Sequence, residues 1–383
     1  MNRYLVIAAA ALATALPGHS VAQSPAELDD LKAEVDVLNA KLAAMEAQEK
    51  TPSWVDKFSI KGDMRYRYEN IDRETADETR ERHRIRARIG LYTQANDTLD
   101  LGFRLATGGG NPRSTNQTIG DAFSTKDIGV DLAYAAWTPV ESFTTTFGKM
   151  PDTWKRTPIR LFYDSDITPE GIAATWRGDL FFATAEWFQL DENSADDDPQ
   201  HLGAQLGANF ELGEMGFTAT LGYYDLIDVE GLNPCYMGDC NNNTVDANGN
   251  LVFDYNVTEL DLVGTMTLGG LPLSVFASWA QNGDAEEDTA YAFGATLGKT
   301  SDAGTWDVGI IYQEIEKDAL YGQYVDATFA NGDTDVRGWM FKAGYGIAKN
   351  WAFVFTYYLD ELNQSLPTKE DFDMFILDLN WKF

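Results

Sequence analysis

The sequence predicts an all-β protein, a sixteen-stranded antiparallel transmembrane β-barrel with a short N-terminal periplasmic coiled-coil helix. Apolar and polar residues alternate along most of the chain, and short connectors alternate with long ones. Aromatic residues make up 13% of the chain, although its mean hydropathy is only −0.30. Transmembrane barrels combine these properties because their lumen-facing residues dilute the hydropathy of the lipid-facing ones. A β-sandwich or propeller is the competing fold, but neither needs the alternation of connectors.

Residues 1–22 have the pattern of a signal peptide. A basic Arg3 precedes an apolar run from Tyr4 to Leu16, and small residues stand at Ser20 and Ala22. This order favours cleavage before Gln23. The apolar run is also too short to span a bilayer comfortably. We therefore expect an exported protein, which the barrel pattern assigns to a bacterial outer membrane.

Residues 23–52 form the predicted coiled-coil helical segment. Pro25 suits a first helical turn, and Thr51-Pro52 ends the pattern. Apolar residues recur there at alternating spacings of three and four: Leu28, Leu31, Val35, Leu38, Leu42 and Met45. This seam is short, so we expect its assembly to depend on the rest of the chain. The alternative is a solvated helix that packs on the barrel mouth.

Residues 53–383 carry the period-two pattern of the predicted barrel. The last strand shows it clearly, because Leu377, Leu379, Trp381 and Phe383 alternate with the polar residues Asp378, Asn380 and Lys382. Seven short connectors alternate with eight long ones, which predicts sixteen strands with both ends of the barrel segment on the short-turn side. Fourteen or eighteen strands are the alternatives. The long connectors are expected near 69–80, 108–126, 150–168, 191–200, 229–254, 283–288, 317–335 and 362–370.

Composition and motifs argue against several functions. A net charge of −31 argues against nucleic acid as a partner. Outside the signal, the histidines are His83 and His201, which lie in different predicted hairpins. The sequence has no nucleophile elbow, zinc-binding or phosphate-loop motif. We therefore expect no catalytic residues, no cofactor and no metal.

A basic cluster near the start of the barrel is the first candidate site. Six arginines fall on the polar parity of three successive predicted strands: Arg65, Arg67, Arg84, Arg86, Arg88 and Arg104. An arginine that faced lipid near the bilayer midplane would cost about 2–4 kcal/mol. We therefore expect these arginines to line the pore. They can attract anions or pair with lumen acids such as Asp63, Asp100 and Asp131, and both interpretations remain open.

The loop after the fifth predicted strand is the second candidate site. It runs from Gly148-Lys149-Met150 through Tyr163-Asp164-Ser165-Asp166 to Pro169-Glu170-Gly171. With Phe147-Gly148-Lys149 and the terminal Phe383, this stretch resembles the bacterial outer-membrane porin superfamily, most closely the porins with an N-terminal coiled-coil segment. The resemblance implies a trimeric diffusion channel whose third external loop narrows the pore. Applied to this chain, it makes these residues candidates for the constriction: Lys155, Arg156, Arg160, Asp164 and Asp166. The alternative is a loop that lies outside the pore.

Cys235 and Cys240 are the two cysteines of the chain. Their spacing permits a disulfide within a surface loop, and export favours its formation. We expect this bridge to be structural.

The sequence as a whole predicts passive diffusion of small hydrophilic solutes through a charged, water-filled pore, with a preference for anions as a further hypothesis. Outer-membrane lipid, lipopolysaccharide and two further copies of the chain are the expected partners. Two alternatives remain. One is a channel specific for a solute such as phosphate or another anion, and the other is a structural tether that acts through the coiled coil.

Overall fold

The computed structural model describes residues 25–49, 57–157, 162–195 and 197–383 in two units, each considered by itself. The predicted signal peptide, 1–22, lies outside the described residues. In the first unit, α2 (Pro25–Glu49) confirms the expected helix. The seam residues Val35, Leu38 and Leu42 are exposed on it, so the coiled coil stays a prediction. Among the described residues, no helix is both long and apolar enough to cross a bilayer.

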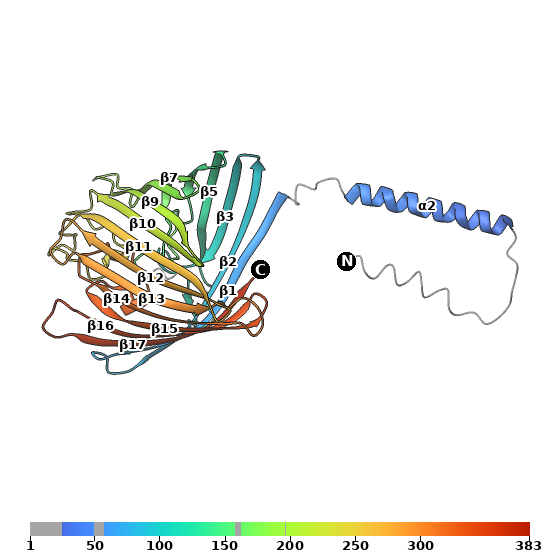
Figure 1. The fold of residues 1–383 in the computed structure, drawn as a ribbon. Helices are drawn as coiled ribbons and strands as arrows, with labels where there is room; N and C mark the ends of the chain where they lie inside the picture. Colours follow the sequence, from blue (N-terminus) through green and yellow to red (C-terminus); the bar gives the residue numbers. More distant parts are fainter. Residues whose placement is uncertain (1–24, 50–56, 158–161, 196) are drawn as a thin grey trace. The chain divides into compact units, whose positions relative to one another are not determined.

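The second unit is a closed antiparallel barrel of sixteen strands, as the alternation predicted (Figure 1). It closes where β1 pairs with β17 on one side and with β2 on the other. A two-residue strand, β4 (Gln117–Thr118), pairs with β2 and is not part of the ring. The strands of the ring are β1 (Phe58–Arg73), β2 (Arg80–Asn96), β3 (Leu99–Thr107), β5 (Ile128–Val140), β6 (Phe143–Lys149), β7 (Glu170–Arg177), β8 (Phe181–Gln189), β9 (Gln200–Leu212), β10 (Met215–Ile227), β11 (Tyr255–Leu268), β12 (Leu271–Asn282), β13 (Thr289–Gly298), β14 (Trp306–Ile315), β15 (Val336–Ala348), β16 (Trp351–Leu362) and β17 (Glu370–Lys382).

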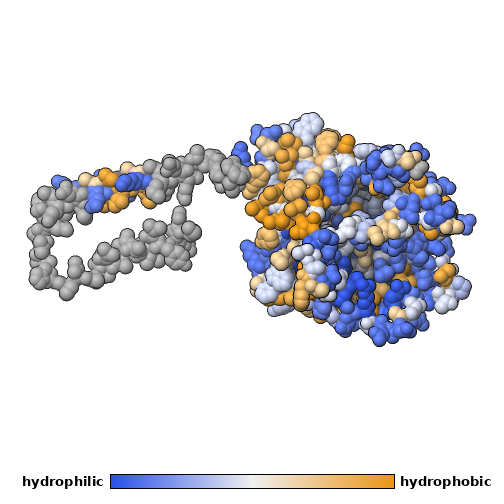
Figure 2. Space-filling model, turned by 180° about the vertical axis from the view of Figure 1, so that it is seen from behind, coloured by the Kyte–Doolittle hydropathy of each residue, from blue (hydrophilic) through white to orange (hydrophobic). Residues whose placement is uncertain are grey.

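The side chains of each strand alternate between the two faces of the wall. On β1, Ile60 and Met64 are exposed on the outer face, whereas Arg67 and Glu69 have the opposite parity and are buried inside the barrel. Figure 2 shows hydrophobic residues gathered on the outer wall and hydrophilic residues at the end with the long loops. An apolar outer surface on a closed barrel suits contact with lipid, because every backbone hydrogen bond is made between strands.

The eight long connectors lie at one end of the barrel, and four of them build its interior. We name these four L2 (108–127), L3 (150–169), L5 (228–254) and L7 (316–335). Buried apolar side chains of three of them form one cluster with inward strand residues; from the loops come Trp154, Phe162, Tyr163, Ile167, Val229, Leu251, Ala319, Leu320, Tyr321, Tyr324, Val325, Phe329 and Ala330. The barrel therefore has a loop-built core at its long-loop end.

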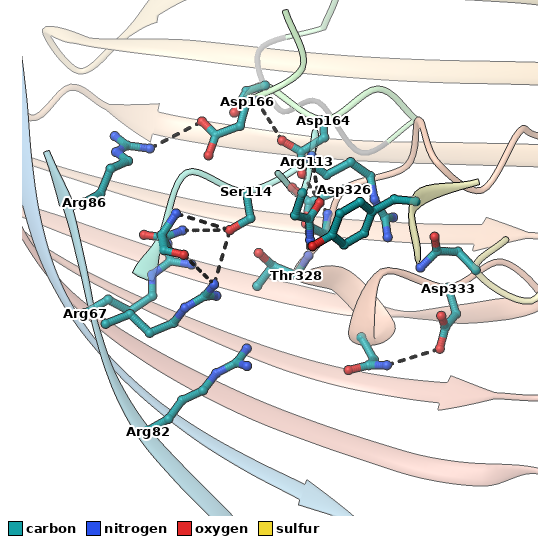
Figure 3. Close-up of a pocket in the computed structure, with 18 of the residues that line it drawn as sticks. Arg67, Arg82, Arg86, Arg113, Ser114, Asp164, Asp166, Asp326, Thr328 and Asp333 are labelled. Carbon is teal, nitrogen blue, oxygen red and sulfur yellow. Dashed lines mark hydrogen bonds and ion pairs between the residues drawn. The ribbon is translucent and has the colours of Figure 1, made fainter. Parts of the chain in front are cut away.

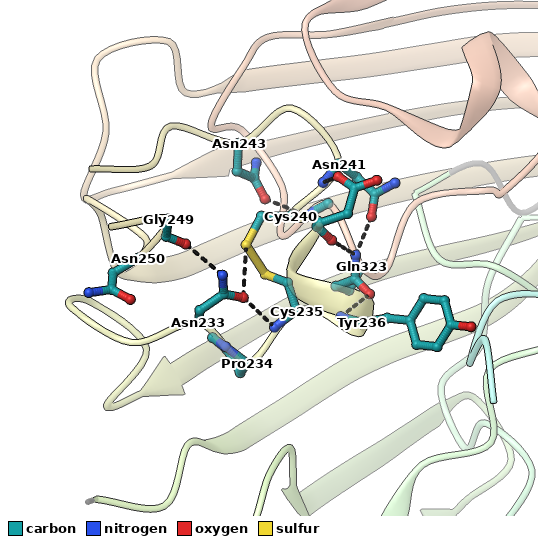
Figure 4. Close-up of a disulfide and its surroundings, with 12 residues drawn as sticks. Asn233, Pro234, Cys235, Tyr236, Cys240, Asn241, Asn243, Gly249, Asn250 and Gln323 are labelled. Carbon is teal, nitrogen blue, oxygen red and sulfur yellow. Dashed lines mark hydrogen bonds between the residues drawn. A yellow bond between two sulfur atoms is a disulfide. The ribbon is translucent and has the colours of Figure 1, made fainter. Parts of the chain in front are cut away.

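L5 and L7 are joined by hydrogen bonds and by close packing (Figure 4). The Asn243 side chain accepts a bond from the Gly322 amide at 2.7 Å and donates to the Leu320 carbonyl at 3.0 Å. The Gln323 side chain accepts from the Tyr236 amide at 3.0 Å. A Cβ on Gly322 would lie 2.5 Å from the Cys240 carbonyl oxygen, so no larger residue fits there. The two loops therefore form one body.

Candidate functional site: a charged cavity inside the barrel

The six arginines of the basic cluster face the barrel lumen, and we call the part of β1–β3 that carries them the arginine wall. Arg65 lies opposite Arg86 in the β1–β2 pairing, and Arg67 lies opposite Arg84. Arg88 and Arg104 lie on the same face of the sheet. Arg104 is paired with Gly90, and Gly90 is two residues from Arg88 on β2, so the two positions share a face. Alternation within three neighbouring strands is enough to bring these side chains together.

Carboxylates of the barrel wall partner these arginines. Arg67 holds Asp378 of β17 with two bonds of 2.8 Å, a bidentate geometry. The Nε atoms of Arg86 and Arg88 lie 3.0 and 2.8 Å from the two oxygens of Asp63. Glu69 also pairs with Arg67, Arg82 and Arg84, and Asp131 pairs with Arg104. Arg65 donates to the amide oxygen of Asn380 and lies 3.9 Å from Asp378. The wall is therefore a network of paired charges that also contains an excess of guanidinium groups.

The described part of L3 lies inside the barrel against this wall. Asp166 accepts bonds from Arg86 Nη1 at 3.4 Å, from Arg88 Nη1 at 3.3 Å, and from the amide and hydroxyl of Thr115 at 3.2 and 3.1 Å. Burial alone would raise the pKa of Asp166, but the two guanidinium groups and the Thr115 amide hold it below the usual carboxyl range. Asp166 therefore connects L3 to the arginine wall as a carboxylate.

Asp164 connects L3 to L7 instead. Its Oδ2 atom accepts the Ala327 amide at 2.8 Å, and its own amide donates to the Tyr324 carbonyl at 2.7 Å. Burial, with Asp326 and Asp166 nearby, raises the pKa of Asp164 well above its usual range. The two carboxyl groups of one loop thus have opposite pKa shifts because only Asp166 contacts arginines.

Two other predicted constriction residues, Lys155 and Arg156, do not line the cavity. Arg156 is buried between Asp152, at 2.8 Å, and Glu259, at 3.3 Å, and it stacks over the Tyr163 ring at 4.1 Å. Lys155 is exposed, and its backbone bonds to the Gln205 side chain. Arg160 lies outside the described residues. The structure therefore places Asp164 and Asp166 at the cavity but gives Arg156 an anchoring position, because its guanidinium group is enclosed by carboxylates and aromatic rings.

Trp154 fixes the inward position of L3. The ring packs on β10 at Gly222, where a Cβ atom would lie 2.6 Å from ring carbon Cζ3. It also lies edge-on to Tyr224, with 6.1 Å between the ring centroids. Glycine at position 222 leaves room for the ring, so Trp154 can pack here only because this strand position has no side chain.

A cavity of about 420 Å³ lies between the arginine wall and the inward loops (Figure 3). Wall residues and L3 supply one part of its lining, with Arg65, Arg67, Arg82, Arg84, Arg86, Asp164 and Asp166. Sequence reasoning did not predict Arg82, nor the rest of the lining, which comes mainly from L2, L5 and L7: Asn111, Arg113, Ser114, Asn116, Tyr236, Met237, Asp239, Asn241, Asp326, Ala327, Thr328, Asn331 and Asp333. The apolar residues within L7 could have indicated that this loop is buried, because a solvated loop does not need them.

Arg113 of L2 holds L7 in place. Its Nη1 atom donates to three backbone carbonyls, those of Gly322, Val325 and Gly332, at 2.8–3.2 Å. Arg113 is buried, with 7% of the residue exposed. Since these partners are neutral carbonyls, the positive charge of Arg113 is not neutralised by a described ion pair.

The loop side of the cavity carries carboxylates. Asp164, Asp239, Asp326 and Asp333 form no ion pair with any residue that the structure describes. Burial raises the pKa of Asp326 and of Asp333 above the ordinary carboxyl range. In Figure 3, Arg67, Arg82 and Arg86 project from the wall, whereas Asp326 and Asp333 come from the loops. The cavity therefore has a guanidinium-rich side and a carboxylate-rich side.

The disulfide joins Cys235 and Cys240 of L5, with the two sulfurs 2.11 Å apart (Figure 4). The bridged segment carries Tyr236, Met237 and Asp239 into the lining of the cavity. The bridge thus lies in an inward loop, which gives it a position next to the candidate site.

His201 of β9 contacts L7. Its ring nitrogens lie 2.9 Å from the Tyr324 hydroxyl and 3.0 Å from Glu186 Oε1, and Tyr224 stacks on the ring. His83, in contrast, bonds to Tyr66 on the outer face of β1 and β2. The two histidines therefore occupy different sides of the wall.

The closed barrel, its inward loops and its charged cavity are the architecture of a β-barrel channel. Comparison with known families gives a match to the model described as "putative porin" over residues 72–254 and 244–383, and the chain belongs to this family. No curated protein matches the sequence. The family and the fold support an outer-membrane location and a channel function.

Solved structures show the same fold at low sequence identity. OprB of Pseudomonas putida is 12% identical, with a TM-score of 0.59 over 86% of this chain and 95% of its own. OmpF of Salmonella typhi, in complex with daunomycin, is 14% identical, with a TM-score of 0.53 over 86% and 99%. A loop-deletion variant of OmpT, an outer-membrane protein of Vibrio cholerae, is 15% identical, with a TM-score of 0.51 over 86% and 100%.

Proposed function

We propose that this protein is an outer-membrane porin that lets small hydrophilic solutes diffuse passively through a charged, water-filled pore, with an anion preference set by the arginine wall. The cavity inside a closed, outwardly apolar barrel is the observation that carries the proposal. Its lining is almost entirely polar or charged, which suits hydrated solutes. In this proposal, residues 1–22 direct export, and lipid and lipopolysaccharide surround the barrel.

An excess of positive charge on the arginine wall supports a modest preference for anions. Six guanidinium groups (Arg65, Arg67, Arg82, Arg84, Arg86 and Arg88) share four carboxylates (Asp63, Glu69, Asp166 and Asp378). The excess is small, and the carboxylates on the loop side oppose it. We therefore expect the pore to favour anions weakly, and less than the number of arginines alone would suggest.

Planar-bilayer recording tests both parts of the proposal. The purified full-length protein should produce discrete, ohmic steps in KCl, and a salt gradient should give a reversal potential of the sign for anion preference. The triple variant R84Q/R86Q/R88Q should lose that preference. A matched control, R177Q/K299Q/K349Q, removes three exposed charges near the short-turn end and should retain it. Absence of conductance would overturn the porin proposal. An unchanged reversal potential in the first variant would show that these arginines have a purely structural role.

The homotrimer is a second part of the proposal, and α2 is its expected contributor outside the barrel. The exposed apolar residues Val35, Leu38 and Leu42 favour packing against further copies of the helix. Light scattering in detergent should give a trimer for the full chain. Deleting residues 24–50 should weaken that trimer while conductance persists, whereas a tether would retain its pore but lose envelope integrity in cells.

A further inference from the structure

The guanidinium side of the cavity retains unused hydrogen-bond donors. Arg65 donates through Nε to Asn380, and Arg82 donates through Nε to Glu69. The Nη atoms of both arginines donate to no residue in the described part of the chain. Such N–H groups are suited to a carboxylate or another oxyanion.

The carboxylate side retains unused acceptors. Asp326 accepts the amides of Thr328 and Phe329 through Oδ1 alone, and Asp239 accepts the Asn241 amide through Oδ1 alone. Neither residue has an ion-pair partner within the described ranges. A free carboxylate oxygen that faces a cavity is suited to an ammonium group.

A single small molecule can occupy the space between the two sides. The cavity volume of about 420 Å³ lies within the range of roughly 300–1,000 Å³ that is usual for small-molecule sites. All but a few of the lining residues are polar or charged, so the cavity suits a polar occupant.

We propose that the cavity is a saturable binding site for small zwitterions of the amino-acid type, an inference that rests on the proposed porin function. The carboxylate of the solute binds to Arg65 and Arg82 on the barrel wall, and its ammonium group binds to Asp326 of L7. A monoanion is attracted by the arginines but repelled by the carboxylates. A cation is attracted by the carboxylates but repelled by the arginines. A zwitterion satisfies both sides and adds no net charge to the site.

Three probes with matched frames test this selectivity. Alanine, lactate and alaninamide have the same number of heavy atoms; lactate replaces the ammonium by a hydroxyl group, and alaninamide replaces the carboxylate by an amide. Each probe is added to the full-length protein in a planar bilayer, and its block of the KCl current is followed with concentration. Alanine should give a saturable block at a concentration roughly tenfold lower than either analogue, because each analogue loses a charge-assisted bond.

Two variants with matched controls localise the site. R82Q removes an unused donor edge, and D326N retains the oxygen that accepts the Thr328 and Phe329 amides. Each should raise the half-blocking concentration of alanine roughly tenfold. R104Q changes a paired lumen arginine that does not line the cavity, and D121N changes an exposed carboxylate of L2. Both controls should leave the block of alanine unchanged.

The possible outcomes separate this inference from the porin proposal. Ohmic KCl conductance without saturable block by alanine would overturn the zwitterion site and leave the porin standing. Equal block by alanine and lactate would show an anion site, and equal block by alanine and alaninamide would show a cation site; either result overturns the inference. Equal effects of R82Q and R104Q would also overturn it. Absence of any conductance would overturn the porin proposal itself.

Discussion

Replacing Asp166 by Asn should change both the selectivity of the pore and the hold of L3 on the wall. Asp166 is 9% exposed at its side chain and contacts Arg86 and Arg88 at 3.4 and 3.3 Å. Attraction between opposite charges at such distances is about 5 kcal/mol at an effective dielectric constant of 20, but the cost of burial offsets much of it. Asn still accepts bonds from Thr115, so we expect D166N to destabilise the fold by about 2 kcal/mol.

The electrical effect of D166N follows from the lost negative charge. An anion in water about 7 Å from this position would be stabilised by about 0.6 kcal/mol, and a cation destabilised equally, so the anion-to-cation permeability ratio should rise severalfold. Salt screens the effect, so reversal potentials should be measured at low ionic strength. D121N, which removes an exposed carboxylate of L2, is the control. A permeability ratio that is the same in D166N and D121N would refute the position of Asp166 beside the permeating ions.

Three further predictions concern the inward loops. Reducing the Cys235–Cys240 bridge, or replacing both cysteines by Ser, should lower the free energy of unfolding by about 2 kcal/mol, measured by denaturant titration. It should also increase the noise of the open-channel current in bilayer recordings. Unchanged noise would contradict a role of the bridge in holding L5 in place. Burial raises the pKa of Asp164 and of Asp326, so these groups gain protons above the ordinary carboxyl range as the pH falls. Because the folded-state pKa values exceed the unfolded ones, their protonation favours the folded state at lower pH, and selectivity should move towards anions there; a selectivity that changes only within the ordinary carboxyl range would contradict this. R113A removes the donor to three L7 carbonyls and should destabilise the protein by about 3 kcal/mol in thermal unfolding, whereas an unchanged melting temperature would show that L7 is held by other contacts.

The barrel could be predicted from the sequence because its main signal is local. Period-two alternation places Arg84, Arg86 and Arg88 on one face whatever the rest of the chain does. The partners Asp63 and Asp131 could be anticipated for the same reason, since they lie on neighbouring strands. Asp100, considered with them, forms no ion pair among the described residues.

The cavity could not be predicted because its contacts join distant parts of the chain. Arg67 meets Asp378 only because the first and last strands close the barrel. Arg113 reaches the carbonyls of L7 across the lumen, and no periodicity encodes such a contact. Sequence similarity to porins indicated that L3 turns inward, but it gave no indication that L2, L5 and L7 complete the lining.

Cysteine accessibility at Thr328 tests most directly whether the charged cavity lies on the conduction path. Thr328 lines the cavity, and both natural cysteines are in a disulfide, so T328C introduces a single free thiol. A charged methanethiosulfonate reagent should sharply reduce the open-channel current of T328C. The same reagent should have no effect on S124C, at an exposed L2 position outside the cavity. An unchanged current in modified T328C would contradict the account, because ions would then pass without entering the cavity.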